Sequence, residues 1–341
     1  MDRKERFFAT IAREPVDRPA SWLGLPTVPA IPGLYRYFGV DNENALKEKI
    51  NDDVFPVEVP YRSPAGNHIA CAFDFAQKGS NYEERTLTAP GFFENYSDPG
   101  RVDDFDWPDP GLYIDRGECL RNIGQIPSGY AKMGIMWSAN FQDACAAFGM
   151  ETALMKMLAE REMFTAVIDR ITDFYLKANE IFYENTKGEL DAVLLGNDFG
   201  SQTGLMVDPD LLKELVFPDI KKLIVQAKNY GLKVVYHSCG SIFPIIDDLI
   251  DLGVDVIHPI QALAKDMEPQ KLKTHFGDRV SFCGGVDAQY LLVNGSPGQV
   301  EAKVNELKEI FPTGLIISPS HEAILPDIPP ANVKALFDAL K

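Results

Sequence analysis

The chain has 341 residues, of which 45% are hydrophobic and 24% are charged. This balance is typical of a globular protein and excludes a disordered or fibrous chain. Its formal net charge is −17 at pH 7, and so acidic a surface repels nucleic-acid backbones and anionic membranes. We therefore expect no nucleic-acid partner and no membrane partner.

Three features bear on the cellular compartment. The five cysteines are widely scattered, which favours reduced thiols over a disulfide framework. Five of the first eight residues (MDRKERFF) are charged, and this stretch lacks the apolar run of a signal peptide. No apolar stretch reaches the roughly 18 residues that a transmembrane helix needs. We expect a soluble, cytoplasmic protein.

The first half of the chain has weaker structural signals than the second. Three apolar runs are candidate strands: residues 20–25, 54–60 and 130–137. Residues 60–110 are rich in Pro, Gly, Asp and Asn and predict a long insertion beside the mouth of the fold, with a hairpin that pairs 69–75 with 82–88. Residues 150–185 are long and amphipathic, which predicts two helices.

In the second half, short apolar runs alternate with longer amphipathic stretches. Five runs are predicted strands: residues 190–196, 232–237, 254–260, 280–284 and 314–319. Helices are predicted at 209–228, from about 242, and at 269–275, 297–311 and 330–340. Apolar strands separated by such helices indicate parallel pairing with both faces covered.

Five strand–helix units fit either an open doubly wound sheet or a closed barrel. The three upstream runs raise the strand count to eight, which is the number in a (β/α)8 barrel. We therefore expect one domain over residues 1–341, a TIM barrel of the α/β class. It carries an N-terminal extension and a long inserted segment near residues 60–110.

Polar residues gather where the predicted strands end. Active sites of (β/α)8 barrels form at the carboxyl ends of the strands. The residues at these ends are Asn197, Asp198, His237, Cys239, His258, Gln261, Cys283, His321 and Glu322. Three of the five histidines and two of the five cysteines are among them, so we expect a functional site at this rim.

His237 and Cys239 are two residues apart on an extended stretch, so their side chains leave on the same face. An imidazole beside a thiolate forms a zinc-binding pair, and zinc takes three or four such ligands. Cys283 is a candidate third ligand, and His321 and Glu322 are candidates from the last strand. Fewer than four protein ligands would leave a position for water, substrate or a thiol, as in a catalytic metal site.

Each of these residues also has a plainer interpretation. His237 and Cys239 fit buried strand positions without a metal, and Cys283 fits a packed core residue. Asp198 fits a helix cap. In the functional interpretation, Asp198 acts as a general acid or base and, with Gln261, positions the substrate through hydrogen bonds.

Several motifs resemble, in order and spacing, those of the uroporphyrinogen decarboxylase superfamily. They are residues 4–7 (KERF), 13–19 (REPVDRP), 197–202 (NDFGSQ), 237–240 (HSCG), 282–287 (FCGGVD) and 319–330 (PSHEAILPDIPP). The resemblance runs nearly from end to end and implies a (β/α)8 barrel.

The superfamily includes two chemistries. Its decarboxylases carry an arginine-rich segment after the first strand, whereas residues 22–30 (WLGLPTVPA) contain no arginine. They also carry a histidine near the C-terminus, where Glu322 aligns here, next to His321. The zinc-dependent, corrinoid-linked methyltransferases, such as those that transfer methyl groups from methylcobalamin to coenzyme M, carry an H-x-C pair and a distant third ligand, commonly Cys. His237 and Cys239 match the pair, and Glu322 stands at the third position.

The resemblance to this branch implies a zinc-dependent methyltransferase. It would move a methyl group between a small substrate or thiol and a corrinoid (cobalamin) cofactor on a partner protein. The expected zinc ligands are His237, Cys239, Cys283 and Glu322. The expected catalytic residues are Asp198 and Glu322, and Gln261 and His321 are expected to bind substrate.

Two other functions stay open. One is decarboxylation in tetrapyrrole metabolism, as in uroporphyrinogen decarboxylase, and the other is a non-catalytic relative that binds a corrinoid or tetrapyrrole. Barrels of this kind often self-associate, so a homodimer is a further expectation.

Overall fold

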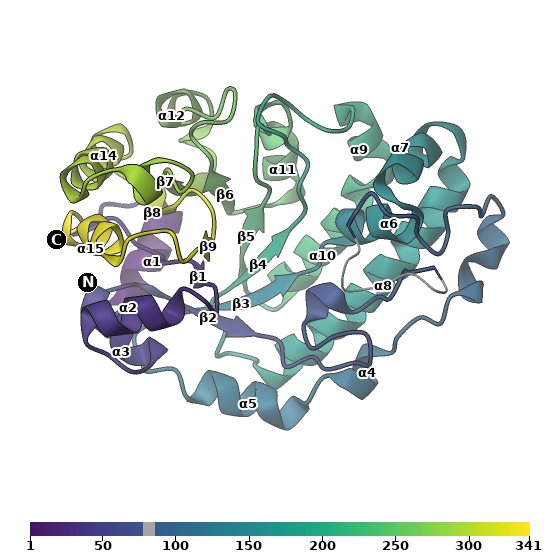
Figure 1. Cartoon of the computed structure of the whole chain (residues 1–341), viewed down its shortest axis with the longest axis horizontal. Coiled ribbons are helices and arrows are strands. Elements are labelled where there is room, and N and C mark those ends of the chain that lie inside the picture. Colours follow the sequence, from purple (N-terminus) through teal and green to yellow (C-terminus); the bar gives the residue numbers. More distant parts are fainter. Residues whose placement is uncertain (78–85) are drawn as a thin grey trace.

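Seven parallel strands form one curled sheet at the centre of the molecule (Figure 1). This is seen in a computed structural model that describes residues 1–77 and 86–341. The strand order follows the sequence. The strands are β2 (Val54–Glu58), β3 (Ala131–Trp137), β4 (Ala192–Gly196), β5 (Lys233–His237), β6 (Val256–Ile260), β7 (Ser281–Val286) and β8 (Leu315–Pro319). They confirm the predicted parallel α/β barrel and seven of its eight predicted strands.

Helices alternate with the strands and cover the outside of the sheet (Figure 1). The helices are α1 (Arg3–Ile11), α2 (Ile31–Phe38), α3 (Glu43–Ile50), α4 (Pro110–Tyr113), α5 (Arg116–Gly124), α6 (Asn140–Phe148), α7 (Met150–Ala159), α8 (Arg161–Asn185), α9 (Pro209–Leu215), α10 (Phe217–Asn229), α11 (Ile246–Leu252), α12 (Pro269–Phe276), α13 (Leu291–Asn294), α14 (Pro297–Ile310) and α15 (Pro330–Asp338). The 3₁₀ turns are η1 (Ile69–Cys71), η3 (Pro99–Asp104) and η4 (Phe243–Ile245). The predicted helices are confirmed; the region 209–228 is divided into α9 and α10. Within the described ranges, no helix is long and apolar enough to cross a membrane.

The first barrel position is occupied by a short segment rather than a full strand. Ser21 forms a single parallel bridge with Ile317 of β8, and the Asp53 N–H donates to the Ser21 carbonyl. The chain then pairs elsewhere, as β1 (Leu25–Pro26) beside β9 (Ala323–Ile324). The Asp53 carboxylate accepts a hydrogen bond from the Ser21 N–H at 2.9 Å. A side chain therefore stands in place of the backbone acceptor that a neighbouring strand would provide. The predicted strand at 20–25 is therefore only partly formed.

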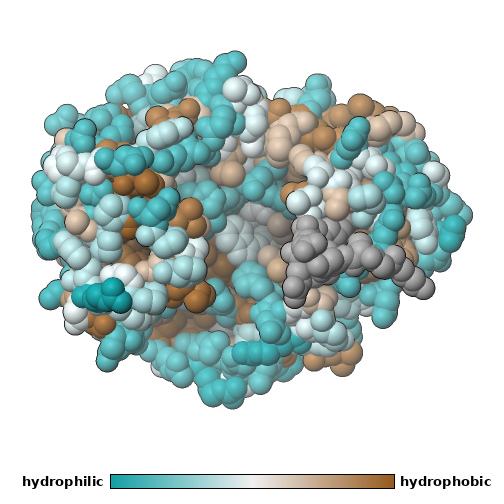
Figure 2. Space-filling model, in the orientation of Figure 1, coloured by the Kyte–Doolittle hydropathy of each residue, from teal (hydrophilic) through white to brown (hydrophobic). Residues whose placement is uncertain are grey.

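Buried ion pairs close the N-terminal end of the barrel. The Asp53 carboxylate accepts hydrogen bonds from Arg6 and Arg18, each at 2.7 Å. Lys47 donates to Asp52 at 2.8 Å. The predicted N-terminal extension is α1, whose apolar side chains pack into the inner core beneath the strands. The opposite, carboxyl end is the open mouth, and Figure 2 shows the surface hollowed near its centre, beside the place of β9 in Figure 1.

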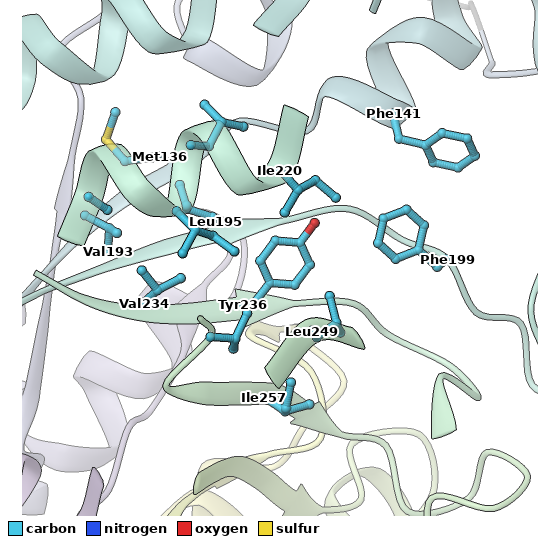
Figure 3. Close-up of a cluster of buried hydrophobic side chains, with 14 of the residues drawn as sticks. Met136, Phe141, Val193, Leu195, Phe199, Ile220, Val234, Tyr236, Leu249 and Ile257 are labelled. Carbon is cyan, nitrogen blue, oxygen red and sulfur yellow. The ribbon is translucent and has the colours of Figure 1, made fainter. Parts of the chain in front are cut away.

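Side chains alternate between two cores along each strand. On β4, Val193 and Leu195 face outward, whereas Ala192 and Leu194 face the barrel interior. This alternation follows from the two-residue period of a strand. In Figure 3 the outer side chains of β4 and β5 pack beside Ile220 of α10 and other apolar groups. Their burial on both faces explains why the strands are continuous apolar runs in the sequence.

The long connection between β2 and β3 lies beside the mouth, as predicted. Its aromatic side chains pack on one another and on α8; the ring centroids of Phe73 and Phe174, for example, are 4.8 Å apart. The predicted hairpin is wrong in its first arm, since Ile69–Cys71 is a 3₁₀ turn capped by the His68 side chain. The second arm, 82–88, lies partly outside the described residues.

Candidate functional site

The loops that follow β4 and β5 touch backbone to backbone. Gly240 has φ +84°, and a Cβ built on it would lie 2.6 Å from the carbonyl carbon of Gly200. A larger residue at either position would force the loops apart. The contact brings Asp198 next to Cys239, whose N–H and Sγ both lie 3.2 Å from Asp198 Oδ1.

His237, the last residue of β5, lies between two carboxylates. Its Nε2 is 3.2 Å from Asp198 Oδ1, and its Nδ1 is 3.3 Å from Glu322 Oε2. Nδ1 also lies 3.1 Å from His258 Nδ1 on the neighbouring strand. Glu322 is held in place by the β1–β9 pair, because the Leu25 N–H donates to the Glu322 carbonyl at 2.7 Å.

These side chains form two donor groups that share His237. One group is Asp198, His237 and Cys239, and the other is His237, His258 and Glu322; in each, the ligand atoms lie within 4.8 Å of one another. In this described part of the chain, Glu322 Oε2 and His258 Nε2 are buried without a hydrogen-bond partner. Buried polar atoms without partners are uncommon and call for an explanation, such as a bound ion.

The first group fits zinc in both chemistry and spacing. Thiolate, imidazole and carboxylate are the ligands that zinc takes in proteins, at about 2.0 to 2.3 Å. Two ligands of a tetrahedral ion at these distances are roughly 3.4 Å apart. The 3.2 Å separations from Asp198 Oδ1 to His237 Nε2 and to Cys239 Sγ are close to that value. His237 Nδ1 then faces Glu322, and a carboxylate in that position orients a ligating histidine.

The charged groups of the cluster shift one another's pKa values. Burial alone would lower the pKa of His237, but Glu322 and Asp198 outweigh it and raise that pKa to about 10. Burial would raise the pKa of Asp198, but His237 lowers it below its usual range. Burial raises the pKa of the Cys239 thiol. Without a metal, the cluster is an imidazolium between carboxylates, an arrangement in which a metal cation can replace a proton.

Asp198, His237 and Glu322 lie in the wall of a cleft of about 650 Å³, whereas Cys239 and His258 lie behind these lining residues. The inserted segment, the end of β3, α6 and the loop between β8 and β9 form the other walls. The lining residues are Ala70, Phe73, Phe75, Thr86, Leu87, Trp137, Ala139, Gln142, Asp143, Ala146, Gly196, Asp198, His237, His321 and Glu322. The volume is sufficient for a small organic molecule.

Among the residues singled out from the sequence, the structure brings Asp198, His237, Cys239 and Glu322 together. It does not bring Cys283 into either donor group, which corrects its expected role as a third ligand. Cys283 is packed in the inner core, in the layer that contains Val235, two residues before His237 on β5. Its side chain is therefore one layer below the mouth.

The two residues expected to bind substrate have different surroundings. His321 lines the cleft, and its Nδ1 accepts a hydrogen bond from the Ala323 N–H at 3.1 Å. Gln261 is buried, and its side-chain oxygen accepts the Gly240 N–H at 2.7 Å. Gln261 thus fixes the loop that carries Cys239 and is not part of the cleft lining.

Sequence reasoning did not single out Trp137. Its backbone and that of Ser138 have φ of +55° and +53°, which for residues other than glycine costs on the order of 1–3 kcal/mol each. The strained turn places the indole ring 5.4 Å from the His237 ring, edge to face. An aromatic residue at the carboxyl end of a barrel strand was the available signal.

Comparison with known proteins identifies the family. Residues 132–341, more than half of the chain, match the family model described as uroporphyrinogen decarboxylase (URO-D). The chain belongs to this family. The match covers β3 to α15 and therefore every member of the two donor groups.

Named relatives fall into two kinds of enzyme. A methylcobamide:CoM methyltransferase MtaA from Methanosarcina barkeri is 25% identical over 171 residues, 49% of each chain. A uroporphyrinogen decarboxylase from Chlorobium luteolum is 29% identical over 141 residues, 39% of this chain and 37% of the relative. The matches thus span half or less of these relatives. A methyltransferase structure from Methanosarcina mazei, 18% identical, superposes with a TM-score of 0.69 over 99% of this chain and 98% of that one, which shows the shared fold.

Proposed function

We propose that the protein is a cytoplasmic, zinc-dependent methyltransferase that moves a methyl group between a small molecule and a corrinoid carried by a partner protein. The observation that carries the proposal is the convergence of the ligand atoms of Asp198, His237 and Cys239, two of which, Asp198 and His237, line an open cleft. Similarity to methylcobamide:CoM methyltransferases supports the corrinoid part.

In this proposal, Asp198, His237 and Cys239 hold the zinc. Three protein ligands leave a coordination position for a substrate atom. When bound, zinc lowers the pKa of a thiol or polarises an oxygen, which prepares that atom to accept or release a methyl group. Glu322 faces His237 Nδ1 and fixes the ring orientation. Asp198 takes the ligand position that was expected of Cys283.

The remaining residues hold the loops and contact the ligand. Gln261 holds the Cys239 loop through the Gly240 N–H. His321 lies in the cleft wall beside Glu322, where it contacts the substrate in this proposal. A corrinoid on another protein would need access from the mouth of the barrel, where the surface is hollowed (Figure 2).

Decarboxylation of a tetrapyrrole receives less support. A substrate with many carboxylates needs cationic groups to hold it, most effectively arginine. Within residues 1–77 and 86–341, neither arginine nor lysine lines the cleft. The cleft instead presents three carboxyl groups, from Asp143, Asp198 and Glu322, which would repel such a substrate.

Methyl transfer and metal content test this proposal together. The zinc-loaded protein is mixed with methylcobalamin and a panel of neutral and charged thiols, and loss of the methylcobalamin absorbance is followed. We expect transfer by the wild type and by His275→Ala, a change on the exposed face of α12, and none by His237→Ala. Purified protein that takes up no zinc, or metal-free protein that releases CO2 from uroporphyrinogen, would overturn the proposal.

A further inference from the structure

The start of α6 forms the wall of the cleft that carries Gln142 and Asp143. It is fixed there by Asn197, the residue after β4. The Asn197 side-chain oxygen accepts the Phe141 N–H at 2.9 Å, and its amide donates to the Tyr236 hydroxyl at 3.0 Å. The position of Asp143 in the cleft is therefore tied to the same strand end that carries Asp198.

Both side chains on this wall offer hydrogen-bond acceptors. The Asp143 carboxylate accepts from the Tyr175 hydroxyl at 2.5 Å. In the described structure, Gln142 Oε1 is buried and has no hydrogen-bond partner. An acceptor left without a partner costs roughly 1–3 kcal/mol, and a ligand that donates hydrogen bonds would recover that free energy.

Aromatic rings provide the apolar part of the cleft. Phe73 and Phe75, from the inserted segment, and Trp137, from the end of β3, all line it. Aromatic faces attract cations as well as apolar surface. Rings together with a carboxylate form a combination suited to an organic ammonium group.

The net charge of the cleft also favours a cationic ligand. Zinc bound by Asp198 and a Cys239 thiolate would have a net charge near zero, which leaves Glu322 and Asp143 as additional negative groups. The imidazole of His321 is occupied within the chain, since its Nδ1 accepts the Ala323 N–H at 3.1 Å. Within the described ranges, no lysine or arginine lines the cleft to compensate.

We propose that the cleft binds a cationic amine with an apolar or aromatic body, excludes anionic ligands, and owes this selectivity to Asp143. Neutral hydrogen-bond donors bind with intermediate affinity. Asp143 contacts the ammonium group, Gln142 accepts a second hydrogen bond, and the rings cover the body of the ligand. The inference names a substrate class for the proposed methyltransferase, but it concerns binding alone, so it can hold or fail independently of methyl transfer.

The selectivity depends on pH. Burial raises the pKa of Asp143 to about 7, against the opposing effect of the Tyr175 hydrogen bond. The carboxyl is thus neutral below pH 7 and charged above it, so preference for a cation grows as the pH rises. The other titratable groups near it are Tyr175 of α8, Cys71, Cys145 and, across the cleft, Asp198, His237, His321 and Glu322.

Three probes of similar size test the proposal: benzylamine, benzyl alcohol and benzoate. Their dissociation constants are measured by ligand-observed NMR on the zinc-loaded protein, without corrinoid. We expect benzylamine to bind at least about 10-fold more tightly than benzoate at about pH 8, with benzyl alcohol between them, a ratio set by one charge–charge contact in a partly buried site. Asp143→Asn should reduce the ratio to about 3-fold or less and remove most of its rise between about pH 6 and pH 8.

The variant keeps an oxygen that can accept the Tyr175 hydrogen bond, and melting temperatures report whether it folds. Glu58→Gln is the matched control, because Glu58 is a carboxylate of β2 that lines a different groove; it should leave the ratio unchanged. Equal binding of benzoate and benzylamine, no binding of benzylamine by the wild type, or an unchanged ratio in a folded Asp143→Asn variant would each overturn the proposal.

Discussion

Each end of the barrel contains a buried carboxylate, but the two carboxylates differ in their hydrogen bonds. At the N-terminal end, Asp53 is fully buried and receives hydrogen bonds from Arg6, Arg18 and the Ser21 backbone. At the carboxyl end, Glu322 is nearly as buried, and its Oε2 lies 3.3 Å from His237 Nδ1, yet it accepts no hydrogen bond in the described structure.

The difference separates a structural network from a binding site. Buried charges that are fully paired hold a fold together, and breaking them costs stability. Buried donors and acceptors that converge without partners cost stability in the free protein and recover it when a ligand binds. On this view, the N-terminal network is part of the fold, and the rim cluster is the proposed metal site.

The largest effect should follow removal of two of the proposed zinc ligands. His237→Ala with Cys239→Ser should lower zinc affinity by at least about 1,000-fold, because two of three protein ligands are lost. Competition with a chromogenic chelator measures the affinity. His275→Ala with Cys71→Ser removes the same residue types from exposed positions and should retain full affinity; equal loss in both double variants would contradict the assignment.

At the N-terminal end of the barrel, we expect a substitution to lower stability and to leave zinc affinity unchanged. Asp53→Asn leaves Arg6 and Arg18 facing an uncharged amide, and the free energy of unfolding should fall by about 3–5 kcal/mol. Urea denaturation measures this loss. Zinc affinity of the folded variant should be unchanged, and a variant as stable as the wild type would remove the contrast between the two ends.

These two regions also show what the sequence could predict. Short apolar runs, separated by amphipathic stretches, predicted seven strands correctly. The runs are continuous because both faces of each strand are buried. The segment at 20–25 was expected to be a full strand, but Asp52 and Asp53 take its N–H groups, and side-chain contacts between distant residues leave no local pattern.

The candidate site was also predicted in part from the sequence. Strand-end positions identified Asp198, His237, Cys239 and Glu322, since parallel strands end at one rim. They also suggested Cys283, because position along a strand does not reveal which layer of the barrel a residue occupies. Asp143 and Trp137 were missed, since a helix start and a strained turn bring them to the cleft.

A smaller effect is expected from the residue that faces the other side of His237. Glu322→Gln keeps the size of the side chain and removes its charge, so the imidazole loses the carboxylate that orients it. Zinc affinity should fall by about 10- to 100-fold. A loss as large as that of the double ligand variant would instead make Glu322 a direct ligand.

The smallest effect on metal binding should come from Cys283. Cys283→Ala removes a packed inner-core atom one layer below the mouth, so the free energy of unfolding should fall by about 1 kcal/mol. Zinc stoichiometry should be unchanged, as measured by mass spectrometry of the metal. Loss of zinc from a folded variant would restore Cys283 as a ligand.

X-ray absorption at the zinc edge of the zinc-loaded protein tests the central claim most directly. We predict one zinc per chain whose nearest neighbours include one sulfur, with the remaining ligands nitrogen or oxygen, as Asp198, His237 and Cys239 would supply. The sulfur signal should disappear in Cys239→Ser. Two sulfur neighbours, or no stoichiometric zinc at all, would contradict the account.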